Sequence, residues 1–125
     1  LPLKFPTEHH PIKSVLAMRA CCALENDQDT LYAFSHAMFK AYFTHGRDID
    51  DSSVVADVAN TLGIDGERLV DRASEQVVKD RLRANTEEAI AKGAFGSPTM
   101  IVNEDRLYFG NDQLPLVRQA LLSRA

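Results

Sequence analysis

The sequence has no tryptophan and only two cysteines, and these two are adjacent, at Cys21 and Cys22. Neighbouring residues of a helix point about 100° apart, so the pair can neither close an ordinary disulfide nor hold a zinc ion by itself. The disulfide-rich architectures of small secreted proteins are therefore excluded. The simplest interpretation is a pair of small core residues in a reducing compartment, and we expect a cytoplasmic protein.

Positive charge is also scarce. The 125 residues include 14 lysines and arginines against 18 aspartates and glutamates, which gives a formal net charge of -4. This balance argues against a nucleic-acid partner. No apolar run approaches the roughly 18 residues needed to cross a bilayer, and no signal-peptide pattern opens the chain, so no membrane partner is expected. The densest acidic run, at 48–51, falls at an expected helix start and indicates dipole complementation, not a metal site.

Most of the chain has the apolar spacing of amphipathic helices. The expected helices run over 12–24, 28–44 and 75–92, with two shorter helices between the second and the last. N-cap residues are expected before three of them: Asp27, Asp51 or Ser52, and Asp65. The helix over 75–92 is expected to turn four apolar residues inward: Val78, Leu82, Ala89 and Ile90.

The pattern changes after Gly93. Two β-type runs, 99–102 and 106–109, flank a polar turn and predict a hairpin. A last amphipathic helix follows, with Leu114, Val117 and Leu121 on its apolar face. Because Pro115 fits only the first turn of that helix, the N-cap is expected near Asn111 or Asp112.

The predicted hairpin cannot stand by itself. Two strands are marginally stable in water, and the 125 residues contain no other convincing strand. We therefore expect either that another chain supplies the missing strands or that the sequence is the C-terminal portion of a longer protein. Its first residue is Leu1 and not Met, as the second alternative predicts.

The order of motifs around the hairpin is specific. It reads Gly93-Ala94-Phe95-Gly96-Ser97-Pro98-Thr99 before and through the first strand, then Phe109-Gly110-Asn111-Asp112 ahead of the last helix. This resembles the C-terminal half of a thioredoxin-fold domain in the DsbA-related family of 2-hydroxychromene-2-carboxylate isomerases and kappa-class glutathione transferases. The resemblance implies an α/β, thioredoxin-like fold. Residues 1–92 would be a linker end and an all-helical insertion domain, and 93–125 the C-terminal ββα part. The N-terminal βαβ half would lie upstream of Leu1.

The resemblance also implies a glutathione site. The family's proline at the position of Pro98 is cis, so that the backbone of Ser97 faces outward and can pair with the cysteinyl part of glutathione. Gly110, Asn111 and Asp112 would bind the γ-glutamyl end, where helix-start amides attract a carboxylate and an aspartate accepts from an ammonium. From the residues alone, Pro98 is an ordinary strand-opening proline, and Asn111 and Asp112 are N-caps.

The implied activity is that of a glutathione-dependent isomerase or transferase, acting on unsaturated acids of the aromatic-degradation type. Its catalytic serine would lie in the first βα turn of the missing half, so no catalytic residue is assigned within this chain. The protein would lower the pKa of the glutathione thiol and hold the thiol against its substrate. Phe5, Pro6 and Phe95 are candidate walls of the substrate pocket. The expected partners are a small-molecule substrate and, as is common in the family, a second copy in a homodimer.

Two other interpretations remain open at this point. A DsbA-like thiol–disulfide oxidoreductase would carry Cys-x-x-Cys upstream of Leu1, although Gly110-Asn111-Asp112 favours the glutathione-dependent enzyme. A non-catalytic helical module, whose hairpin completes a partner's sheet, would instead be stable, monomeric and indifferent to glutathione.

Overall fold

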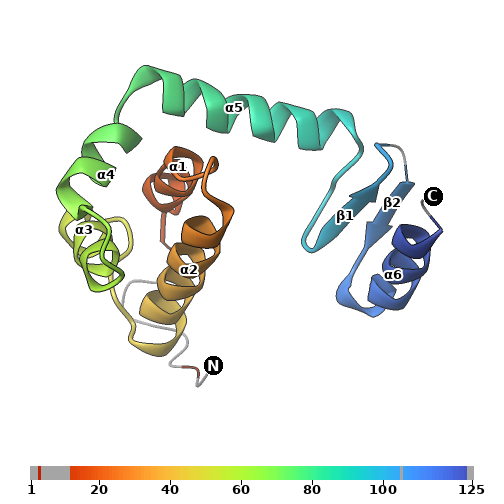
Figure 1. Cartoon of the computed structure of the whole chain (residues 1–125), viewed down its shortest axis with the longest axis horizontal. Helices are drawn as coiled ribbons and strands as arrows, with labels where there is room; N and C mark the ends of the chain where they lie inside the picture. The colour runs from red at the N-terminus through yellow and green to blue at the C-terminus, as the bar shows by residue number, and fades with distance from the viewer. Residues whose placement is uncertain (1–2, 4–11, 105, 124–125) are drawn as a thin grey trace. The chain divides into compact units, whose positions relative to one another are not determined.

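The computed structural model describes residues 3, 12–104 and 106–123, and the chain divides into two compact units, Leu1–Leu82 and Arg83–Ala125 (Figure 1). The boundary between them falls inside α5 (Gln76–Ala91). The first unit is helical, and the second contains the hairpin. The family division expected between residues 92 and 93 lies ten residues further along the chain, at the end of α5, and stays a prediction.

The helical unit contains α1 (Val15–Ala23), α2 (Gln28–Phe39), the π-helical segment η1 (Lys40–Thr44), α3 (Ser52–Thr61) and α4 (Gly66–Ala73). The three expected N-caps are confirmed. Asp27 accepts a hydrogen bond from the Thr30 amide at 3.1 Å, Asp51 from the Ser53 amide at 2.8 Å, and Asp65 from the Arg68 amide at 3.1 Å. Each side chain satisfies a backbone donor that has no partner within its own helix.

The expected helix over 28–44 changes character in its last turn. In η1 the amide of His45 donates to the carbonyl of Lys40, five residues earlier, at 3.1 Å. A π turn of this kind accommodates one extra residue, and such turns are frequent at functional sites. The Arg47 amide then donates to the Ala41 carbonyl at 2.9 Å. Beyond η1, Gly46 has the left-handed φ of 63° expected of a helix stop.

The core of the helical unit lies where α1 to α4 meet, and its centre is made of Phe34 on α2 and Val55 on α3, both 0% exposed. Small residues line α1, where Ala17, Ala20 and Ala23 are buried, so this helix approaches its neighbours closely. The first part of α5 joins the same unit. Val78 is buried there, and the Arg81 guanidinium pairs with the Glu25 carboxylate at 2.9 Å.

The second unit has the expected hairpin. Strands β1 (Thr99–Val102) and β2 (Arg106–Phe109) are antiparallel, and Met100 pairs with Tyr108. Asn103 and Glu104 follow β1 with left-handed φ of 54° and 70°, a conformation typical of turn residues. The short 3₁₀ segment η2 (Asn111–Gln113) leads into α6 (Leu114–Leu122), which packs on β1 (Figure 1).

Two expectations about apolar faces are wrong within the part of the chain that the structure describes. On α5, Ala89 is exposed and Ile90 is 67% exposed. On α6, Leu114 and Leu121 are about half exposed, and the buried residue is Ala120. A sheet of two strands is too narrow to cover the whole apolar face of a helix. Pro115 does lie in the first turn of α6, as predicted.

The core generates a stability prediction. Phe34→Ala leaves a cavity among helices that cannot fully collapse, and we expect it to lower the free energy of unfolding by about 3–5 kcal/mol. The control is Tyr32→Ala on the same helix. Tyr32 is 74% exposed, so this change should alter stability by no more than about 0.5 kcal/mol. Urea unfolding followed by circular dichroism measures both. Equal losses in the two variants would contradict this assignment of the core.

Candidate functional site

The two halves of the sequence motif meet at the open end of the hairpin. The peptide bond between Ser97 and Pro98 is cis, as the resemblance implies. The amide of Gly110 donates to the carbonyl of Pro98 at 2.9 Å, which continues the ladder of β1 and β2 by one bond. The hydrogen bond holds the Ser97–Pro98 turn beside the Gly110-Asn111-Asp112 turn, although Gly110 comes twelve positions after Pro98 in the sequence.

The backbone of Ser97 is available for a ligand. Ser97 and Pro98 are exposed, and no residue in the described ranges 12–104 and 106–123 makes a hydrogen bond to the amide or the carbonyl of Ser97. The turn itself is fixed from within, since the Thr99 hydroxyl donates to the Gly96 carbonyl. A donor and an acceptor are thus presented together on a rigid turn, which is what an extended peptide needs in order to pair with it.

The second turn owes its shape to Gly110. The φ of Gly110 is 94°, and a Cβ placed there would lie 2.5 Å from Oδ1 of Asp112, so only glycine fits. The expectation that Asn111 or Asp112 is the N-cap is wrong. Neither side chain caps a backbone amide, because these residues form the 3₁₀ turn η2, and Gln113 is the residue before α6.

This correction leaves polar groups of the second turn open to a ligand. Across the described stretches of chain, the amides of Asn111 and Asp112 have no hydrogen-bond acceptor. The exposed carboxylate of Asp112 has one long hydrogen bond, from the Gln113 side-chain amide at 3.4 Å, and no cation within ion-pair distance in the same part of the chain. Two amides without an acceptor and one carboxylate with a single long hydrogen bond are the groups that would receive the carboxylate and the ammonium of an amino acid.

Two aromatic rings border the first turn. The rings of Phe95 and Phe109 lie 4.6 Å apart, and Phe95 is 74% exposed. A Cβ on Gly96 would come within 2.8 Å of the Phe109 ring, so the glycine lets that ring lie directly against the turn. Of the three pocket-wall candidates, Phe95 therefore lies next to the candidate site, while Phe5 and Pro6 lie outside the described residues.

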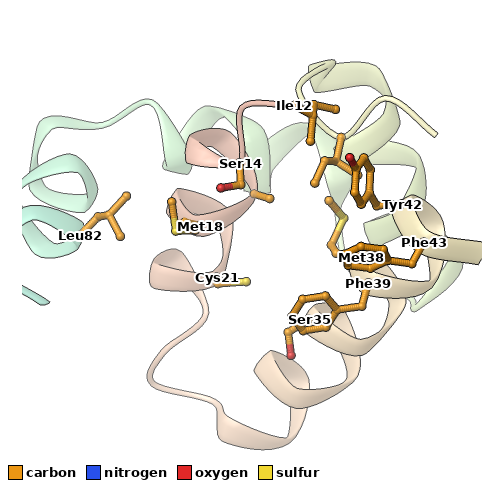
Figure 2. Close-up of a pocket in the computed structure, with 12 residues that line it drawn as sticks. Ile12, Ser14, Met18, Cys21, Ser35, Met38, Phe39, Tyr42, Phe43 and Leu82 are labelled. Carbon is orange, nitrogen blue, oxygen red and sulfur yellow. The ribbon is translucent and has the colours of Figure 1, made fainter. Parts of the chain in front are cut away.

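A second feature, in the helical unit, was missed by sequence reasoning. An apolar pocket of about 490 Å³ opens between α1 on one side and α2 with η1 on the other (Figure 2). Met18 on α1 lies opposite the side chains of α2 and η1, and Leu82 of α5 also lines the pocket. The main lining residues are Met18, Met38, Phe39, Tyr42, Phe43 and Leu82. Aromatic residues at helical spacing are typical of an ordinary core. Phe39, 58% exposed, could not be distinguished from core by periodicity alone.

Within the described residues, no group of three or more histidine, cysteine, aspartate or glutamate side chains could hold a metal ion. The helices of that part of the chain are also too short or too polar to cross a membrane.

The fold and the paired turns agree with what similarity to other proteins shows. Residues 1–122 match the family described as DSBA-like thioredoxin domain. The chain belongs to this family. The two turns at the end of its hairpin are accordingly turns of a DSBA-like domain, and its helices are the helical part of one.

The DSBA-like chain has curated relatives with two kinds of name. It is 29% identical over 128 residues to "Glutathione S-transferase kappa 1" of Rattus norvegicus, covering 97% of this chain and 57% of the relative. It is 29% identical over 103 residues to "2-hydroxychromene-2-carboxylate isomerase" of Sphingobium xenophagum, covering 82% of this chain and 52% of the relative.

A solved structure agrees with these relatives. The chain superposes on selenomethionine-labelled 2-hydroxychromene-2-carboxylate isomerase with a TM-score of 0.74 at 26% sequence identity, covering 97% of this chain and 57% of that one. The DSBA-like chain therefore spans somewhat more than half the length of the proteins it matches. All of them are named as enzymes, of the glutathione transferase or the isomerase kind.

The two cysteines of the DSBA-like chain are not joined in a disulfide bond, and both side chains are half-buried. Cys21 lines the apolar pocket. Burial, and secondarily the neighbouring Cys22, raises the pKa of the Cys21 thiol from 9.0 to about 11. Because the thiolate is the nucleophile, Cys21 is held in its unreactive form at neutral pH. This is the inert core cysteine that the sequence predicts.

The raised pKa predicts a pH dependence of stability. Between pH 9 and pH 11 the unfolded chain loses the Cys21 proton while the folded chain keeps it, so the free energy of unfolding falls as the pH rises through this window. Urea unfolding at several pH values should show a shallower fall for Cys21→Ala than for the wild type, with the two curves parallel below pH 8. Equal slopes above pH 9 would contradict the assigned pKa.

Proposed function

We propose that the protein containing this chain is a glutathione-dependent isomerase or transferase of the kind that its relatives' names describe, acting on an apolar, unsaturated acid. The observation that carries the proposal is the hydrogen bond from the Gly110 amide to the Pro98 carbonyl, 2.9 Å long. This hydrogen bond holds the Ser97 backbone, which has no hydrogen-bond partner in the described ranges, beside the amides and the carboxylate of Asn111 and Asp112. We call the surface formed by these two turns the glutathione surface.

The residues of this surface fit the parts of glutathione. The amide and carbonyl of Ser97 would pair with the backbone of the cysteinyl residue, as an added strand pairs with a sheet edge. The amides of Asn111 and Asp112 would donate to the γ-glutamyl carboxylate, and the Asp112 carboxylate would accept from the ammonium. Glutathione, when bound, supplies the thiol that reacts. These residues of the chain bind and orient the tripeptide, and they neither take nor give a proton.

The apolar pocket of the helical unit is proposed to take the apolar body of the second substrate. Its volume of about 490 Å³ falls in the range of small-molecule sites, which are mostly apolar with a few polar groups. Ser14 and Ser35 are among its lining residues, and the Ser35 hydroxyl donates to the Tyr32 carbonyl at 3.1 Å. The thioethers of Met18 and Met38 adapt to flat ligands and contact aromatic rings favourably.

The first test addresses the glutathione site. Asp112→Ala removes the acceptor for the ammonium, and we expect glutathione to bind about tenfold more weakly, the size of one charge-assisted hydrogen bond. The measurement is calorimetric titration of the full-length protein with glutathione. Asp71→Ala is the control, because it removes an equally exposed carboxylate on α4 and the same charge. Unchanged affinity in Asp112→Ala would remove the assignment.

The second test addresses the apolar pocket. Because the chain has no tryptophan, Phe39→Trp places a single indole fluorophore in the pocket wall. Added 1-naphthol should quench its emission in a saturable way. A second change, Ser35→Phe, should abolish this quenching by filling the pocket, whereas Val77→Phe, at a position 68% exposed on α5, should not. Undiminished saturable quenching in the Ser35→Phe protein would show that naphthol binds elsewhere.

A further inference from the structure

A smaller pocket lies in the same helical unit, and its charge is unlike that of the rest of the chain. It encloses about 350 Å³. Met38, Phe39, Tyr42 and Phe43 of α2 and η1 line the apolar pocket described above, whereas Ala37, Lys40, Ala41 and His45 line this one. Residues from α3 and its approach complete the wall. Neither the glutathione surface nor the proposed substrate pocket uses any of these side chains.

All the ionisable groups that line this pocket are basic: Lys40, His45 and Arg47. A chain with a formal net charge of -4 thus contains a hollow whose lining carries no carboxylate. Lys40 and His45 lie at the two ends of the π turn, where their backbones are joined by a hydrogen bond of 3.1 Å, and both residues line this pocket. Clustered positive charge of this kind attracts anions.

Arg47 is held in place on two sides. Its amide donates to the Ala41 carbonyl at 2.9 Å, and its guanidinium donates to the Asp57 carboxylate of α3 at 2.9 Å. The side chain is 36% exposed. A guanidinium has five N–H donors in a planar fork, so the ion pair with Asp57 positions the group and leaves donors for a ligand. Less rotamer entropy is then lost when a ligand binds.

The charges near the pocket select the charge of the ligand. The charges of Arg47 and Asp57 cancel formally, so the ammonium of Lys40 leaves a single positive charge when histidine is counted as neutral, as it is in the formal net charge of -4. A monoanion would neutralise this charge. The remaining wall includes Ala37, Ala41 and Val58. Ala41 and Val58 are buried, so the apolar surface that they offer is small and suits only a small ligand. The Thr61 hydroxyl already donates to the Val58 carbonyl at 2.6 Å.

We propose that this pocket is a binding site for a small monocarboxylate with an apolar body, with Lys40 and Arg47 on the carboxylate and Ala37, Ala41 and Val58 against the body. The site is independent of the proposed glutathione-dependent activity, because it shares no residue with either surface that supports that activity. Failure of one proposal leaves the other standing.

The test is a methyl NMR titration of the full chain at pH 8 with three probes: benzoate, its neutral isostere benzamide, and inorganic phosphate. Benzoate should shift the methyl signals of Ala37, Ala41 and Val58 in a saturable way, with the signals of Met18 and Met38 reporting any binding in the apolar pocket. Benzamide should leave the first set unshifted. Equal shifts by benzamide would overturn the proposal, because the charge would then play no part. Phosphate binding more tightly than benzoate would overturn the choice of a monocarboxylate.

Three single-charge variants sharpen the result. Arg47→Gln and Lys40→Gln should each weaken benzoate binding by about tenfold, the size of a hydrogen bond to a charged group. Arg68→Gln, an equal charge loss at an exposed position on α4, should leave affinity unchanged. Wild-type affinity in Arg47→Gln and Lys40→Gln would overturn the proposal. Unchanged spectra of the unliganded variants verify that they are folded.

Discussion

The hydrogen bond between the Gly110 amide and the Pro98 carbonyl is the constraint on which the rest of the candidate site depends. Two exposed turns would otherwise sample many relative positions, because neither is buried. The bond continues the strand ladder by one step, so the rigidity of the hairpin extends to both turns. Gly96 and Gly110 make this possible, since a side chain at either position would collide with Phe109 or with Asp112. Backbone geometry therefore places the ligand-binding groups, and side-chain chemistry completes them.

The local structure of the chain could be predicted from the sequence wherever a few neighbouring residues determine it. Asp27, Asp51 and Asp65 cap the helices that they were expected to cap, and the two strands have the predicted bounds. The predictions that were wrong concern which face of a helix is buried, and not where the helices and strands lie. Ile90 and Leu121 have helical spacing but are exposed, because an apolar stripe is buried only where another element covers it. Periodicity gives the stripe and carries no information about the covering element.

The same reasoning explains why the two turns of the proposed glutathione site could be predicted from the sequence and the two pockets could not. The turns are specified by two short motifs, Gly96-Ser97-Pro98 and Gly110-Asn111-Asp112. Glycine and proline in these motifs restrict or permit particular backbone conformations, so the motifs can be recognised in the sequence. The pockets depend on how far apart α1, α2 and α3 lie, and no sequence pattern encodes that distance. The π turn at Lys40–Thr44 has the same origin. The residues of this turn are compatible with an ordinary α-helix, so their propensities do not predict hydrogen bonds that reach five residues back. We attribute the π turn to packing at the end of α2.

The two pockets of the helical unit lie on different faces of the helix formed by α2 and η1. Residues three and four apart share a face of a helix. Ser35, Met38, Phe39 and Tyr42 have this spacing and line the apolar pocket, whereas Ala37, Lys40 and Ala41 have the same spacing and line the basic one. The aromatic ring of Tyr42 meets that of Phe43 edge-on at 4.8 Å on the apolar side. The helical spacing therefore separates apolar from basic side chains, and a substitution on one face should leave the lining of the other pocket unchanged.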